Sequence, residues 1–215
     1  MNILVIHGHP NEGSYNRALV DAYADGARSA GATVRTLDLG ALEFDPVLHH
    51  GYAKIQPLEP DLLAAQADIE WCDHLVLGFP VWWGAPPAPL KGFFDRTFLP
   101  GWAFKFRGRW PLPQKLLKGR TAHVIVTMDS PQPVYSAIYW RSAHRAVIRG
   151  VLRFCGIGPV TTSTVGGVKF LPEAVRTWHV RRQAKLGESV VPARLRPTPA
   201  ASPQGGLEAV RSTAA

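Results

Sequence analysis

The feature that most constrains this chain is a regular alternation between short apolar runs and longer amphipathic segments. Five runs have the length and β-branched content of buried strands, namely 2–7, 32–39, 73–80, 121–128 and 158–167. The segments between them repeat apolar residues at helical spacing, and we expect helices at 14–30, 60–72, 89–98, 135–156 and 172–187. Strands that alternate with helices predict a parallel sheet covered by helices on both faces.

The length and composition set the domain organisation. A chain of 215 residues suits one domain with a full hydrophobic core, and 46% hydrophobic against 19% charged residues indicates a globular body. From Glu188 to Ala215 the chain is rich in Pro, Ala, Ser and Arg and has little periodicity. We therefore expect one domain at 1–187 and a disordered tail at 188–215. Residues 99–119 hold three prolines and three glycines, which predicts an insertion without regular structure.

Location and cysteine chemistry follow from simple signals. No apolar run approaches the roughly 20 residues of a membrane span, and the first strand begins directly after Asn2, without a leader. We therefore expect a cytoplasmic protein with no membrane span. Cys72 and Cys155 cannot form a disulfide framework and show no metal-ligand spacing, so both are predicted to be core residues.

The net charge of +8 has several interpretations. Basic residues concentrate at 105–120, which contains no acid, and at 141–153. No recognised nucleic-acid motif accompanies them, so we expect no nucleic-acid partner. A solvated basic face and a site for phosphorylated small molecules both remain open.

In parallel α/β sheets, ligands bind beyond the carboxyl ends of the strands, so the loops after the first, third and fourth strands are the places to look. The first loop, "HGHPNEGSYN" (7–16), puts small and polar residues before a helix N-terminus, which is a favourable anion site. Gly8 and Gly13 have P-loop spacing, but Ser14 stands where the motif needs Lys. His7 and His9 form a His-x-His pair with no Cys close in sequence, and we predict no metal there. A phosphate cradle and a capped helix without a ligand both remain open.

The other two loops carry aromatic residues. Trp82 and Trp83 adjoin in "FPVWWGAPPAPLKGFFDRTF" (79–98), and large flat side chains on a rigid loop suit a flat ligand. A hydrophobic plug or a dimer contact is the alternative. After the fourth strand, "TMDSPQPVYSAIYWR" (127–141) makes a tight turn before Tyr135. A buried tyrosine hydroxyl can stabilise developing charge on a ligand, although many tyrosines only fill a core.

Together the three stretches resemble the flavodoxin-like NAD(P)H:quinone oxidoreductases, the DT-diaphorase and modulator-of-drug-activity family, from residue 1 to about 186. The most specific part is 79–98, which is similar to the family signature Phe-Pro-x-x-Trp followed by Pro-Ala-x-Leu-Lys-Gly and an acid-Arg pair. The stretch 9–16 is similar to the flavin phosphate loop His-x4-Ser-Phe/Tyr-Asn, and "LRFCGI" (152–157) matches another family segment. The resemblance implies a flavodoxin-like three-layer α/β sandwich whose five-stranded parallel sheet has the order 2-1-3-4-5.

The resemblance also implies a flavin, FAD or alternatively FMN, with NAD(P)H as co-substrate. Its phosphates would be held by His9, Ser14, Tyr15 and Asn16, with the Gly13 backbone nearby. The isoalloxazine edge would run along Pro80, Val81, Trp82 and Trp83, and Trp83 would also wall the substrate pocket. The pyrimidine end of the ring would meet Thr127, Met128, Asp129 and Ser130. Tyr135 would be the active-site tyrosine.

Two positions depart from the family pattern. Asp129 and Ser130 stand where some members have Gly-Gly, and an acid there would oppose the charge of reduced flavin unless it points away. Arg141 stands six residues after Tyr135, where the animal enzymes have a histidine. A fixed cation could stabilise anionic reduced flavin, but it cannot relay a proton. We expect Tyr135, Trp83 and Arg141 to be the catalytic residues.

The predicted activity is a ping-pong transfer of hydride from NAD(P)H through flavin N5 to quinones or similar acceptors. The basic surface would suit NADPH, and the resemblance implies a homodimer with its pockets across the interface. One alternative is a flavin-binding regulatory subunit of a potassium-efflux-type transporter. Another is a flavodoxin-type electron carrier, although such carriers are usually acidic, whereas this chain is basic.

Overall fold

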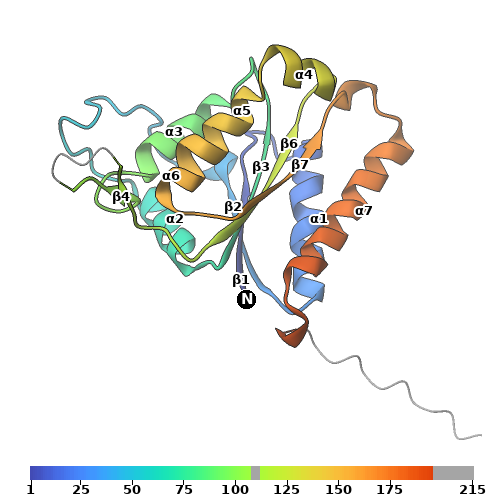
Figure 1. Ribbon diagram of the computed structural model, residues 1–215, viewed down its shortest axis with the longest axis horizontal. Coiled ribbons are helices and arrows are strands. Elements are labelled where there is room, and N and C mark those ends of the chain that lie inside the picture. Colours follow the sequence, from blue (N-terminus) through green and yellow to red (C-terminus); the bar gives the residue numbers. More distant parts are fainter. Residues whose placement is uncertain (108–111, 196–215) are drawn as a thin grey trace, which may run out of the picture.

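The computed structural model describes residues 1–107 and 112–195, and a five-stranded parallel sheet forms its centre (Figure 1). The strands are β1 (Asn2–His7), β2 (Thr33–Asp38), β3 (His74–Pro80), β6 (Thr121–Thr127) and β7 (Val160–Val165). Their order is β2-β1-β3-β6-β7, which confirms the predicted order 2-1-3-4-5 of the five main strands. Every residue of β3 is buried, as expected for the middle strand of a sheet covered on both faces.

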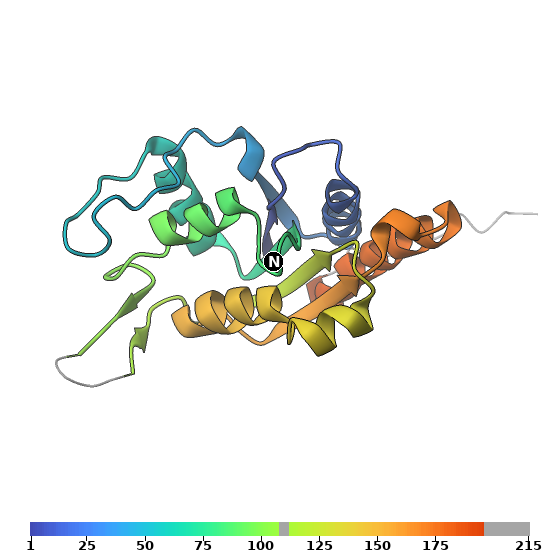
Figure 2. The ribbon, with the colours of Figure 1, turned by 90° about the horizontal axis from the view of Figure 1, so that it is seen from above.

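Helices cover both faces of the sheet (Figure 2). On one face lie α1 (Tyr15–Ser29) and α7 (Glu173–Val190), and on the other lie α2 (Pro60–Trp71) and α3 (Ala88–Thr97) with the chain around 142–155. Successive side chains of a strand point to opposite faces. Accordingly, Leu4 and Ile6 of β1 join the core under α2 and α3, whereas Ile3 and Val5 join the core under α1 and α7. The predicted three-layer sandwich is confirmed.

The single helix predicted at 135–156 is wrong. The segment divides into α4 (Gln132–Ile138), α5 (Ser142–His144), the π-helical η2 (Arg145–Leu152) and α6 (Arg153–Cys155). Between α4 and α5, Trp140 and Arg141 have left-handed backbones with φ of 50° and 55°. Long-range contacts hold this break, because the Ser142 hydroxyl bonds the Gly84 carbonyl across 58 positions of sequence. Local helical periodicity cannot reveal such a contact.

The insertion and the C-terminal segment also differ from expectation. Residues 99–119 contain a short antiparallel pair, β4 (Phe104–Lys105) and β5 (Gln114–Lys115), so the prediction of no regular structure is wrong there. Helix α7 continues to Val190, beyond the predicted boundary at 187, and a 3-10 turn η4 (Ala193–Leu195) follows. Of the predicted tail, residues 196–215 lie outside the described residues.

Three smaller observations complete the description of the fold. Cys72 and Cys155 are both buried, as predicted. Short 3-10 turns, η1 (Leu39–Ala41) and η3 (Val168–Phe170), follow β2 and β7. Within residues 1–107 and 112–195, no helix combines the length and apolar character that a bilayer crossing requires.

Candidate functional site

A cavity of about 500 Å³ opens where the carboxyl ends of β1, β3 and β6 meet. The loops after these three strands line it together with α4 and η3. Its lining residues are His9, Asn11, Ser14, Tyr15, Asn16, Pro80, Val81, Trp82, Trp83, Gly84, Thr127, Met128, Asp129, Ser130, Tyr135, Tyr139 and Val168. Every cofactor residue predicted from the sequence is among them except Gly13. Parallel topology therefore brings three distant motifs to one place, as expected for this class of sheet.

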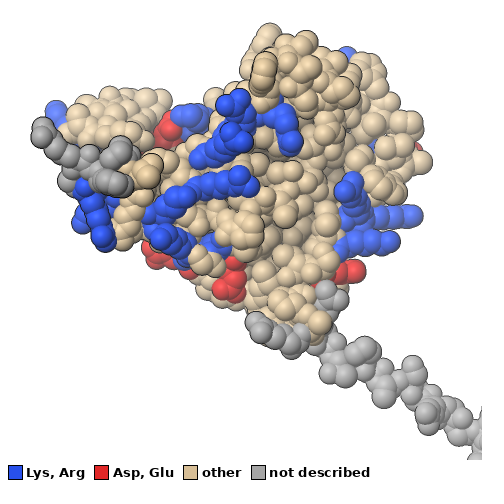
Figure 3. All heavy atoms as spheres, in the orientation of Figure 1, with Lys and Arg blue, Asp and Glu red and all other residues tan. Residues whose placement is uncertain are grey.

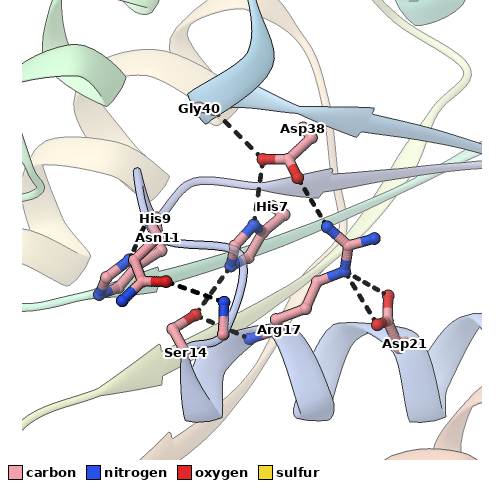
Figure 4. A network of polar contacts seen from close by, with 9 residues as sticks. His7, His9, Asn11, Ser14, Arg17, Asp21, Asp38 and Gly40 are labelled. Carbon is pink, nitrogen blue, oxygen red and sulfur yellow. Dashed lines mark hydrogen bonds and ion pairs between the residues drawn. The ribbon is translucent and has the colours of Figure 1, made fainter.

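Ser14 is the N-cap of α1 and is held by a polar network (Figure 4). Its Oγ accepts a hydrogen bond from the Arg17 backbone N–H at 3.2 Å and lies 3.0 Å from His7 Nε2. His7 Nδ1 lies 3.2 Å from Asp38 Oδ1, and the other carboxylate oxygen of Asp38 accepts from Arg17 Nη1 at 2.6 Å. The imidazole is buried between these partners. The network fixes the Ser14 hydroxyl at the cavity wall.

The first turn of α1 supplies backbone donors for an anion. The N–H groups of Tyr15 and Asn16 have no backbone acceptor in the described part of the chain, as is usual for the first residues of a helix. The N–H of Gly13, which was predicted to lie near the phosphates, donates to Asn11 Oδ1 at 2.8 Å. The N-terminal end of the helix dipole also favours negative charge. This turn is suited to a phosphate.

The side chains of this loop divide into those that face the cavity and those that are engaged elsewhere. The Tyr15 hydroxyl donates to the Arg176 carbonyl at 3.0 Å, so only the ring is left to contact a ligand. Asn16 donates to Thr127 Oγ1 at 3.3 Å, but its buried Oδ1 has no partner among the described residues. Burial and the neighbouring His7 lower the pKa of His9, which is therefore neutral at pH 7. The unpaired Asn16 oxygen is ready to accept a hydrogen bond from a ligand hydroxyl.

The tryptophan loop presents Trp83 to solvent. The Val81 N–H donates to the Thr127 carbonyl at 2.8 Å, and Trp82 and Ala85 exchange two backbone bonds of 2.9 Å. Between them, Trp83 and Gly84 have φ of 52° and 74°, as the two central residues of a type I′ turn do. The left-handed region costs a non-glycine residue about 1–2 kcal/mol. Because the Trp83 side chain is 100% exposed, no packing within the described chain offsets this cost, which indicates a role toward a ligand or a partner.

The turn after β6 resolves the concern about Asp129. Its carboxylate accepts from the Lys169 backbone N–H at 3.1 Å and is thereby held toward η3. The neighbouring backbone is engaged through Met128 N–H, which donates to the Val165 carbonyl at 3.0 Å. The N–H groups of Asp129 and Ser130 have no backbone acceptor within residues 1–107 and 112–195. They can donate to the polar edge of a ring in the cavity.

Tyr135 has a partner that the sequence did not reveal. Its buried hydroxyl accepts from the Ala143 backbone N–H at 3.1 Å and lies 3.1 Å from His144 Nδ1. His144 Nε2 in turn lies 3.0 Å from Thr164 Oγ1. Burial, with the nearby charge of Arg141, lowers the pKa of His144 to about 4, so this imidazole is neutral at pH 7. The two residues meet only because the helix breaks between them, and the sequence carries no local signal of that break.

Arg141 does not line the cavity with Tyr135 and Trp83. It lines a separate groove on the far side of His144. The structure thus brings together two of the three predicted catalytic residues.

The donor groups of the cavity fit a flavin. The first turn of α1 can hold its phosphate, Asn16 Oδ1 can accept from a ribityl hydroxyl, and the N–H groups of Asp129 and Ser130 can meet the pyrimidine edge. The cavity volume of about 500 Å³ lies within the usual range for cofactor sites, roughly 300–1,000 Å³. A bound flavin would supply the hydride chemistry.

Comparisons with known proteins show which family the chain resembles. A family model described as flavodoxin-like fold, Flavodoxin_2, matches residues 1–186. An uncharacterized NAD(P)H oxidoreductase of Haemophilus influenzae is 27% identical over 201 residues, covering 91% of this chain and 98% of its own. The ribosyldihydronicotinamide dehydrogenase (quinone) of Pongo abelii is 26% identical over 223 residues, covering 88% and 94%. The solved NAD(P)H:quinone oxidoreductase of Methanothermobacter marburgensis has a TM-score of 0.74 at 25% identity, covering 88% of this chain and 96% of its own. The chain therefore belongs to the Flavodoxin_2 family, and the predicted kinship with flavodoxin-like NAD(P)H:quinone oxidoreductases is confirmed.

Proposed function

We propose that the protein is a flavin-dependent NAD(P)H:quinone oxidoreductase that uses one pocket for both substrates in ping-pong order. The convergence of three strand-end loops on one cavity supports this proposal most strongly, because it offers a phosphate cradle at one end and an exposed indole at the other. A bound flavin would supply the hydride transfer from the nicotinamide to the quinone. The quinone names of several relatives add support.

The residues of the chain itself would bind the flavin, orient its ring and exclude water from the pocket. Ser14 and the first-turn N–H groups of α1 would hold the phosphate, and the turn at Asp129 and Ser130 would orient the ring. Trp83 would cover the substrate position as a flat wall. Tyr135 would lie beside the ring, with its hydroxyl directed toward His144. To stabilise charge on the flavin, this hydroxyl would have to exchange His144 for the ring as its hydrogen-bond partner. FAD is our preferred cofactor by resemblance.

The cavity mouth also supports a homodimer. Trp82, Trp83, Ile138 and Tyr139 are all exposed around the cavity mouth and the end of α4. An exposed apolar surface of this kind commonly marks an interaction site. We propose that a second copy of the chain covers it and completes the pocket. A molar mass that remains that of a monomer at micromolar concentration in light scattering would refute this.

The activity is tested by spectroscopy and turnover. The purified protein is expected to absorb as a flavoprotein, and mass spectrometry after denaturation identifies FAD or FMN. Steady NAD(P)H oxidation with a soluble quinone, giving parallel double-reciprocal lines, supports the enzyme. A preparation that stays colourless after incubation with both flavins refutes it. Flavin uptake without turnover would instead favour a flavin-binding accessory protein.

A further inference from the structure

A second cavity of about 330 Å³ lies beside the first, between the segment 140–153 and the edge strand β7. Four arginines line it at intervals of four residues, together with Trp140 and Thr162. The arginines are Arg141, Arg145, Arg149 and Arg153. We call this cavity the arginine groove. Figure 3 shows basic side chains gathered over α5 and α6, in the middle of the face that it presents.

The four arginine side chains have nothing to neutralise them. None forms an ion pair or a hydrogen bond with another residue in the described part of the chain. No Asp or Glu is among the residues that line the groove, and the sequence contains none between Ser130 and Pro172. Like charges four positions apart destabilise a helix. A bound anion would remove this repulsion and satisfy the guanidinium donors.

The backbone around the arginine groove is unusual in two ways. Trp140 and Arg141 both lie in the left-handed region, and η2 has π-helical hydrogen bonding. Both features are uncommon and occur preferentially at functional sites. Their combined effect is to place the Trp140 indole at the groove with 72% of its surface exposed. An exposed indole beside guanidinium groups suits a ligand that has both a flat base and phosphates.

The position of the groove relative to the flavin cavity indicates whether the flavin or the co-substrate would reach it. Tyr135 and Tyr139 line the flavin cavity, whereas Trp140 and His144 line the groove, and Tyr135 Oη lies 3.1 Å from His144 Nδ1. The contacting side chains of Tyr135 and His144 thus form the wall between the two cavities. The phosphate cradle of α1 belongs to the other face of the sheet (Figure 2), so a flavin tail anchored there leads away from the groove. A ligand that reaches the groove from the ring is the co-substrate.

We propose that the arginine groove binds the adenosine 2′,5′-bisphosphate end of NADPH, and that Arg145 and Arg149 select NADPH over NADH. This inference rests on the proposed oxidoreductase function. The groove volume of about 330 Å³ lies within the usual range for small-molecule and cofactor sites, roughly 300–1,000 Å³. Guanidinium groups recognise phosphate with two parallel hydrogen bonds, and the 2′-phosphate is the only group that distinguishes the two nucleotides.

The binding arm of the test needs no redox reaction. Adenosine 2′,5′-bisphosphate and adenosine 5′-monophosphate are titrated into the purified full chain by calorimetry. We expect the bisphosphate to bind at least about tenfold more tightly, equivalent to about 1.4 kcal/mol, and the double variant Arg145→Gln/Arg149→Gln to abolish this difference. Arg181→Gln, on the exposed side of α7, is the matched control and is expected to change nothing. Equal binding of the two nucleotides, or unchanged binding by the double variant, overturns the proposal.

The kinetic arm separates this inference from the proposed function. In the double variant, kcat/KM for NADPH is expected to fall about tenfold or more, whereas kcat/KM for NADH stays within about twofold. Equal losses with both nucleotides overturn the groove assignment and leave the oxidoreductase function standing. Arginine-dependent binding of the bisphosphate by a protein that takes up no flavin has the opposite meaning: the groove stands and the proposed function falls.

Discussion

Three buried histidines should make the stability of this protein strongly dependent on pH between about 6.5 and 4. His74 lies 3.1 Å from the Tyr23 hydroxyl and 2.6 Å from Thr121 Oγ1. His123 lies 2.7 Å from Thr161 Oγ1 and 2.9 Å from Ser163 Oγ. Burial lowers the pKa of both to about 4, helped for His74 by the charge of His123, and burial does the same for His144.

The sign and size follow from proton linkage. In the unfolded chain a histidine has a pKa of about 6.5, so between pH 6.5 and 4 it binds a proton that the folded protein excludes. Stability is therefore highest above pH 6.5 and falls as the pH decreases. At pH 5.5 the difference is about 0.9 proton per histidine, and the three together give a slope of about 4 kcal/mol per pH unit. From pH 6.5 to 5 the loss sums to about 5 kcal/mol, similar to the whole stability of many domains.

Urea unfolding followed by tryptophan fluorescence measures this slope at several pH values between about 7.5 and 5. His123→Asn should reduce the slope by about one third, whatever it does to stability at neutral pH. If His123→Asn does not fold, His144→Asn takes its place, and the same reduction of the slope is expected. His50→Gln, at an exposed site, is the control. A free energy of unfolding that is flat from pH 6.5 to 5.5, or an unchanged slope in both buried variants, refutes the reasoning.

Three further predictions concern packing and the cavity. Gly187→Ala would place its Cβ 2.0 Å from the Tyr23 carbonyl oxygen, where α7 crosses α1. Thermal unfolding should therefore show a free energy of unfolding lower by about 1–3 kcal/mol. Gly150→Ala should cost no stability, because its Cβ would meet only one atom, at 4.0 Å. Trp83→Ala should lower kcat/KM for a quinone about tenfold, because it removes the flat wall of the substrate position. A normal quinone rate would remove Trp83 from the pocket wall. Ser14→Ala removes the N-cap of α1, so it should lower the free energy of unfolding by about 1 kcal/mol. It should also weaken flavin binding, measured by fluorescence quenching. An unchanged flavin affinity would argue against the phosphate cradle.

Much of the candidate site could be predicted because its residues adjoin strand ends. The stretches that contain Ser14, Trp83 and Tyr135 each follow a buried apolar run, and the carboxyl ends of parallel strands meet at one edge of the sheet. Knowing the strands was therefore enough to place these residues in one cavity. The hydrogen bonds of the cavity residues could not be predicted in this way, because their partners lie elsewhere in the chain. The Tyr15 hydroxyl bonds Arg176 and the Asp129 carboxylate bonds Lys169, in each case across a long stretch of sequence.

The amino-acid sequence by itself determined the parallel sheet, its helical layers and the edge where the candidate cavity lies, because hydrophobic periodicity is a local property that each segment carries alone. Only the tertiary structure decided where the helix after β6 breaks, and with it the pairing of Tyr135 with His144 and the separation of Arg141 into the arginine groove. That break depends on a hydrogen bond from the Ser142 hydroxyl to the Gly84 carbonyl, in the loop after β3. Contacts between segments far apart in the chain leave no periodic trace in either of them.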